Sequence, residues 1–182
     1  MRARAGRTAQ DYFDAAYGLL AEGGYGKLKL ADLCERMGVT TGGFYHCFKS
    51  WSDFTRQFLD NWHRDRTTRL IDTVAAESDP RKRLSLLLET AASLPHKAEA
   101  AIRVWSTTDR DVEILQRSVD LERKHIVTET FRSMSLTERE AHLRATTALY
   151  LVIGHELSGQ AGDSEALRWS LNALINTAPG SV

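Results

Sequence analysis

Apolar residues recur at helical spacing from the start of the chain. Over residues 8–22 they fall at i, i+3, i+4 and i+7, which aligns them on one face of a helix. The residues of this stripe are Phe13, Ala16, Tyr17 and Leu20. Thr8 precedes the stripe and Asp11 stands three residues later, which is the spacing of a capping box. The pattern predicts an amphipathic first helix that ends at the glycine pair 23–24.

Two much shorter helices follow, and a long one comes after them. The apolar positions predict a helix over 30–37, a stop at Gly38 and a third helix over 41–47. A long helix, capped by Ser50 or Ser52, then continues to about residue 77, and Asp79-Pro80 marks a break after it.

The second half of the chain has no strand-like alternation and reads as five more helices. A capping box, Ser135-x-x-Glu138, is expected to begin the fourth of them, and Asp163 or Ser164 to cap the last. The predicted ranges are 80–94, 97–107, 109–133, 136–158 and 164–177.

Composition agrees with a helical globular protein. The 182 residues are enough for one domain or two small ones, and they include only 3 prolines. Hydrophobic residues make up 42% and charged residues 26%, which is ordinary for a soluble chain. We therefore predict an all-α fold, with a three-helix helix-turn-helix domain over 1–50 and a helical domain over 51–182.

Charge gives no global reason to expect a nucleic acid, because 24 basic and 24 acidic residues balance. A basic arm with Arg2, Arg4 and Arg7 precedes the first helix; it could track phosphates or a minor groove, or be a solvated tail. No run of 18 apolar residues occurs, so we expect no membrane span. Cys34 and Cys47 form no disulfide framework, so we expect a reducing compartment, the cytoplasm.

The stretch GVTTGGFYHCF, residues 38–48, places two glycines in the first turn of a very short helix. Each costs about 1 kcal/mol relative to alanine in a helix interior. Two short helices joined by Gly-Val-Thr are typical of a helix-turn-helix, whose second helix enters the DNA major groove. Small residues there would let the backbone approach the duplex closely. A tight turn in a compact core is the alternative.

The same stretch offers groups that suit DNA contact. Thr40 and Thr41 can present hydroxyls and free backbone N–H groups to a phosphate. Tyr45 and His46 project from the same helix as hydrogen-bonding aromatic groups. The predicted DNA-binding residues are Lys29, Thr40, Thr41, Gly42, Gly43, Tyr45, His46 and Lys49.

The segment EGGYGKLKLADLCERMGVTTGGFYHCFKSWSDF resembles the N-terminal domain of TetR-family transcriptional regulators. The matching features are Gly24-Tyr25, Leu30-x-Asp32-Leu33, Gly38-Val39-Thr40, Tyr45-x-x-Phe48 and Phe54. The resemblance implies a homodimer that places its third helices in the two half-sites of a palindromic double-stranded DNA. It also implies that the helical domain binds a small-molecule effector, which releases the protein, a repressor, from DNA.

Three positions depart from the family's pattern. Leu28 and Lys29 stand where a hydroxyl residue often opens the second helix, and Cys34 replaces an alanine within it. Trp51 replaces a lysine that is common near the start of the fourth helix. Lys29 and Lys49 could supply the phosphate contacts that these changes remove.

The resemblance directs attention to two further sites in the helical domain. Interior aromatic and polar residues are candidates for the effector pocket, with plain core packing as the alternative: Trp62, His63, Arg103, Trp105 and His125. The segment ALYLVIG, residues 148–154, is apolar on every face and is expected to contact both the core and a partner chain. The predicted dimer interface is Tyr150, Ile153, Gly154, Leu157, Leu167, Leu171 and Leu174.

No catalytic, metal or cofactor motif stands out. His155-Glu156 resembles the start of HExxH, but Gly159 stands where the second histidine would be. We therefore predict no enzyme, no metal site and no cofactor. Two alternatives stay open: a constitutive DNA-binding regulator without an effector, and a helical small-molecule-binding protein that retains a helix-turn-helix-like fold.

Overall fold

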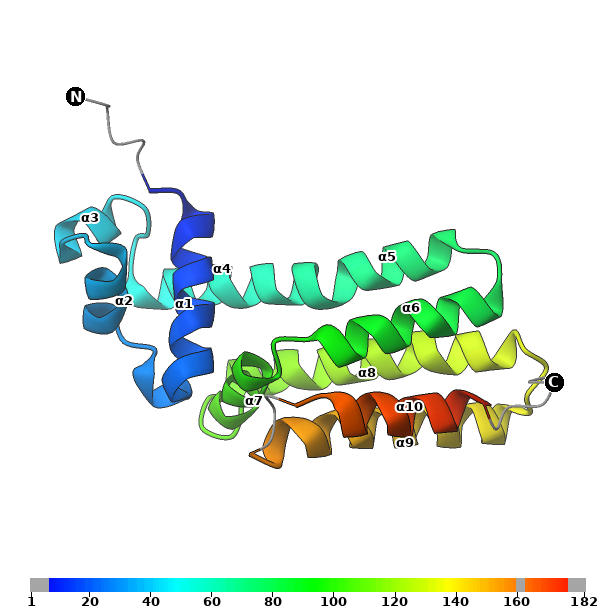
Figure 1. The fold of residues 1–182 in the computed structure, drawn as a ribbon. Helices are drawn as coiled ribbons and strands as arrows, with labels where there is room; N and C mark the ends of the chain where they lie inside the picture. Colours follow the sequence, from blue (N-terminus) through cyan, green and yellow to red (C-terminus); the bar gives the residue numbers. More distant parts are fainter. Residues whose placement is uncertain (1–6, 160–162, 177–182) are drawn as a thin grey trace, which may run out of the picture.

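The computed structural model describes residues 7–159 and 163–176, and it is helical from end to end (Figure 1). The N-terminal part consists of three helices and one short 3-10 turn. These are α1 (Ala9–Gly23), the turn η1 (Tyr25–Lys27), α2 (Leu30–Met37) and α3 (Thr41–Tyr45). The predicted all-α class and the three-helix N-terminal arrangement are confirmed.

A long helical rod leads from this part into the body of the molecule (Figure 1). It is continuous, as predicted, but a π-helical turn interrupts its α-helical hydrogen bonding in the middle. The three pieces are α4 (Trp51–His63), the π turn η2 (Arg64–Thr68) and α5 (Arg69–Ala76). Single π turns inside α-helices are often found at functional sites.

Five helices complete the body, each within two residues of its predicted ends. They are α6 (Pro80–Ser93), α7 (His96–Trp105), α8 (Arg110–Arg132), α9 (Glu138–Leu157) and α10 (Glu165–Asn176). In Figure 1, α6, α8, α9 and α10 run alongside one another, and α7 lies across their end beside α1.

Most of the predicted caps are present. Thr8 and Asp11 form a capping box, and the Ser50 hydroxyl caps α4 by accepting from the Asp53 amide at 3.0 Å. The predicted box at Ser135 is wrong. Ser135 has φ = 65°, which excludes it from the extended N-cap conformation. The capping box instead consists of Thr137 and Glu140.

Aromatic side chains fill the centre of the N-terminal part. Phe44 is fully buried, and its ring lies 5.9 Å from Tyr12, 5.1 Å from Phe48 and 5.6 Å from Phe54 between centroids. Edge-to-face pairs at these distances add to the free energy gained by burying apolar area. This cluster fixes the short α3 against α1 and α4.

The same core continues into α7, across the predicted division at residue 50. Ala98, Ala101 and Ile102 are buried with the α1 and α4 side chains in one cluster. The N-terminal helices and the body are therefore packed together. In the part of the chain that the structure describes, no helix combines the length and apolarity needed to cross a membrane.

Phe44→Ala tests whether this aromatic cluster holds α3. We expect it to lower the free energy of unfolding by about 3–5 kcal/mol, because it empties a fully buried site. Urea unfolding followed by circular dichroism measures the loss.

The neighbouring Tyr45 is the matched control, since 49% of it is exposed. Tyr45→Ala should cost at most about 1.5 kcal/mol, the value of one aromatic contact. Equal losses in the two variants would contradict the packing described here.

Candidate functional site

The N-terminus of α3 is built around Thr40. Thr40 has the extended backbone of an N-cap, and its hydroxyl oxygen accepts a hydrogen bond from the Gly43 amide at 3.1 Å. Thr41 and Gly42, which follow it, are exposed. The first turn of α3 therefore presents hydroxyl and amide groups to solvent, an arrangement that suits a phosphate.

Tyr45 and His46 are exposed at the other end of α3, while Phe44 between them and the first turn points into the core. The predicted DNA-facing residues of this segment are therefore exposed, except Gly43, which is half-buried. Lys49 is exposed just beyond it, and Lys29 is exposed at the N-terminus of α2, which packs on α3. Lys29 gives no side-chain cap to α2, so the hydroxyl cap is replaced by a cation alone.

The protein itself gives no reason for the two glycines. Neither has a positive φ, and a Cβ at Gly42 would come no closer than 3.7 Å to Thr40. A Cβ at Gly43 would stand 3.5 Å from Val39, which is an ordinary contact. A tight turn in the core therefore does not account for them, whereas close approach by a molecule outside the chain would.

The basic arm is described only at Arg7, because Arg2 and Arg4 lie outside the described residues. The Arg7 guanidinium donates to the Met37 carbonyl at 3.2 Å and so holds the start of the chain beside the end of α2. Cys34 is buried, and burial raises the pKa of its thiol, so it is less reactive than an ordinary cysteine. Cys47 is exposed.

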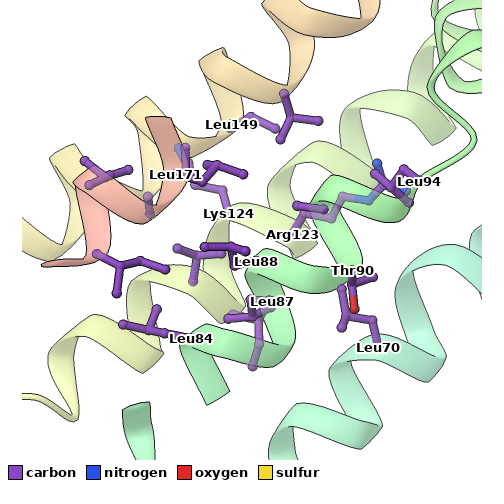
Figure 2. Close-up of a pocket in the computed structure, with 18 of the residues that line it drawn as sticks. Leu70, Leu84, Leu87, Leu88, Thr90, Leu94, Arg123, Lys124, Leu149 and Leu171 are labelled. Atoms are coloured by element: carbon purple, nitrogen blue, oxygen red, sulfur yellow. The ribbon is translucent and has the colours of Figure 1, made fainter. Parts of the chain in front are cut away.

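A largely apolar cavity of about 90 Å³ lies inside the body, between α6, α8, α9 and α10 (Figure 2). Leucines of α6 supply much of its wall, and Arg66 from the π turn and Lys124 from α8 also line it. Sequence reasoning missed these residues. The run LSLLLETAA in α6 was the available signal, since it carries more leucines than one buried stripe requires.

Of the predicted pocket residues, only Arg103 lines this cavity. Trp62 is fully buried at the junction of α4 and α7, and Trp105 is stacked on Tyr25 at 4.9 Å. His63 bonds to Glu122 at 2.9 Å, and His125 is exposed on α8. Trp62, Trp105 and His63 therefore take part in packing or polar contacts outside the cavity, and His125 faces solvent.

The N-terminal helices match a known protein family. Residues 13–54 match the model of the bacterial regulatory proteins of the tetR family, a range that includes α2, α3 and most of α1. The chain carries a TetR-family DNA-binding domain. The predicted helix-turn-helix is therefore confirmed, together with the role in transcription regulation that it implies.

Solved structures of TetR-family regulators and similar proteins share the whole fold. A transcriptional regulator from Saccharomonospora viridis, in complex with choline, superposes with a TM-score of 0.78 at 18% identity, over 93% of this chain and 95% of that one. A TetR regulator from Haloarcula marismortui gives 0.73 at 19%, over 93% and 95%. One from Legionella pneumophila gives 0.75 at 14%, over 95% and 98%. No curated protein matches in sequence.

Partly buried ion pairs join the helices of the body beside the cavity. Arg103 donates to Asp120 at 2.8 Å and to Glu156 at 3.2 Å. Burial alone would lower the pKa of Arg103, but its bonds and attraction to Asp120 and Glu156 raise it, so it stays charged. The same two opposing effects act on Glu122. Burial alone would raise the pKa of its carboxyl, but its hydrogen bond with His63 lowers that pKa below the ordinary value.

The outer face of α9 carries an apolar stripe that has no partner within the described chain. Tyr150 is 67% exposed, and Gly154 and Leu157 follow it on the same face, as expected from the sequence. Ile153 is half-buried beside them. Leu143, seven residues before Tyr150, extends the stripe and was missed, although its heptad spacing is visible in the sequence.

On α10 the exposed face differs from the predicted one. Leu167 and Leu171 are buried against Leu88 and Val152, and Leu174 is half-buried and lines the cavity. Trp169 is instead the exposed apolar side chain of α10, at 73%. The helix is rotated so that its leucines complete the core of their own chain.

Gly42→Ala separates the two explanations of the paired glycines. We expect the variant to be more stable by up to about 1 kcal/mol, because alanine favours helix and the added methyl has room. We also expect its affinity for a selected operator to fall about tenfold, or ~1.4 kcal/mol, because the methyl occupies the space of the approaching duplex.

Thermal unfolding and fluorescence anisotropy measure the two effects. Gly26→Ala is the control, since Gly26 also has open space around it but lies in η1, away from α3. Undiminished DNA binding by the Gly42 variant would count against close approach at this position.

Proposed function

We propose that the protein is a dimeric repressor that binds a palindromic DNA operator through α3 and leaves it when a small-molecule effector binds in the body. The observation that carries the proposal is the exposed surface of α3. It lies at one end of the molecule, away from α5, α9 and α10 (Figure 1). A duplex could reach this surface without contact with the body.

The α3 groups divide into two kinds of contact. Thr40, Thr41 and the first-turn amides suit phosphates, which set the position of a protein on DNA. Tyr45 and His46 suit base edges, because both side chains are exposed and carry hydrogen-bonding groups. Lys29 and Lys49 supply local positive charge in a chain with no net charge.

The dimer is proposed from the apolar stripe of α9 together with Trp169 of α10. Large exposed aromatic side chains are typical centres of protein interfaces. Two copies that pair these helices would form an isologous four-helix contact. Gly154, with open space around it, would permit the helices to approach closely.

The effector is proposed from the cavity. The choline complex of the Saccharomonospora viridis regulator supports a small molecule in a body of this fold. The presence of a cavity in the body also favours an effector over a constitutive regulator. Release requires that the effector bind the DNA-incompetent arrangement of the dimer more tightly than the competent one. A protein of this kind acts in the cytoplasm, where we place it.

Selection from random duplexes, followed by anisotropy, tests the DNA-binding proposal. Replacing Tyr45 and His46 together by alanine should weaken the selected duplex by about 2–6 kcal/mol, or at least ~30-fold, because two base-reading groups are lost. His142→Ala, an exposed histidine on α9, is the matched control and should bind normally. Failure to select any palindrome would refute the proposal.

Sedimentation velocity tests the dimer. Tyr150→Asp combined with Trp169→Asp should give a folded monomer, because each charge would be buried unpaired at the interface. Ile114→Asp, on a side chain 56% exposed and outside the stripe, should remain dimeric. A monomeric parent protein would contradict the proposed assembly.

A further inference from the structure

The charged residues that line the cavity are all of one sign. Four are basic and none is acidic, and the remaining lining is almost wholly aliphatic. The basic residues are Arg66, Arg103, Arg123 and Lys124. An apolar cavity with such a lining favours an anionic group on its occupant.

Two of these cations are already compensated. Arg103 pairs with Asp120 and Glu156, and Arg123 pairs with Glu99 at 3.1 Å. Their charges are therefore satisfied without a ligand.

Arg66 and Lys124 have no carboxylate partner among the described residues. Within residues 7–159 and 163–176, Arg66 makes no ion pair, and its Nε is buried without a hydrogen-bond partner. Its guanidinium lies over the Tyr17 ring, 5.5 Å from the centroid. Lys124 has no ion pair with any described carboxylate. The cavity thus retains an excess of positive charge. An anion that entered it would pair with these cations and lower their free energy.

Two of the arginines lie at the same end of the cavity. Arg123 donates to Thr67 at 3.1 Å, so its guanidinium lies beside the π turn that carries Arg66. Figure 2 shows Arg123, Thr90 and Leu94 toward one side, with Leu84, Leu171 and Lys124 toward the opposite side. A ligand whose charged end lies beside these arginines would place the rest of its length among the leucines.

The end of the cavity that contains Arg66 lies beside a groove on the protein surface. A surface groove between the η2–α5 segment and α6 shares four lining residues with the cavity: Arg66, Leu70, Thr90 and Leu94. A chain that entered through this groove would leave its head group beside Arg66. Beyond Arg66 the lining is almost wholly aliphatic, which suits a hydrocarbon chain.

We propose that the effector is an amphipathic anion, a carboxylate on a hydrocarbon chain. Its carboxylate pairs with Arg66, and its chain lies among the α6, α8 and α10 side chains. The inference rests on the proposed function, since it names the ligand class of the same cavity. It disfavours a quaternary ammonium ligand such as choline, because no acidic residue is among those that line the cavity, although Asp65 lines the groove outside it.

Direct binding to the full chain, without DNA, tests the ligand class. Isothermal titration compares three probes of equal chain length below their micelle concentrations: decanoate, decanol and decyltrimethylammonium. We expect decanoate to bind at least about tenfold more tightly than decanol, as a charge-assisted pair adds to the same apolar contacts. No binding should be seen for the cation. Equal binding of decanoate and decanol, or tighter binding of the cation, would overturn the proposal.

Two variants test whether the ligand carboxylate pairs with Arg66. Arg66→Gln should weaken decanoate about tenfold and leave decanol unchanged, and Arg66→Lys should recover part of the affinity because it restores the charge. Lys82→Gln, an exposed cation on α6 outside both the cavity and the groove, should bind decanoate normally. Equal losses of decanoate and decanol in Arg66→Gln would show a structural role and refute the pairing.

DNA anisotropy with the same probes keeps this inference distinct from the proposed function. Decanoate that binds as expected without releasing the operator would refute effector control and leave the ligand class standing. Release by decyltrimethylammonium but not by decanoate would support effector control and overturn the ligand class.

Discussion

The buried carboxylate of Glu99 joins three helices, α4, α7 and α8. It accepts from the Trp62 indole at 2.7 Å and pairs with Arg123 at 3.1 Å, while only 2% of the residue is exposed. A carboxylate buried so deeply is tolerated only when its partners stay in place. One group on α7 therefore fixes the position of α4 against α8.

This contact lies between the two proposed sites. Trp62 belongs to the helix that starts directly after α3, and Arg123 lines the cavity. The Arg123 guanidinium also lies over the Trp62 ring, 5.9 Å from its centroid. The two side chains therefore interact with each other as well as with Glu99. A ligand that repositioned Arg123 would change the contacts of α4 without any hinge in the shared core. Coupling of this kind requires two arrangements of the junction that the ligand and the DNA favour differently.

Local features account for the success of sequence reasoning in the N-terminal part. The α3 surface follows from Gly38, Thr40 and the glycine pair, whose effects act within a few residues. The caps at Thr8 and Ser50 are local in the same sense. The sequence before α9 allows two capping boxes, Ser135 with Glu138 and Thr137 with Glu140. The positive φ of Ser135 excludes the first, so Thr137 caps the helix.

The sequence by itself determined the helices, their order, the helix-turn-helix and the exposed residues of α3, because periodicity and capping are encoded over one or two turns. Only the tertiary structure decided which side of α10 faces outward, where the cavity lies and which cations lack a partner. Those properties depend on how each helix is rotated about its axis against neighbours far away in sequence. A helix as apolar as α9 or α10 leaves that rotation open until its neighbours are packed against it.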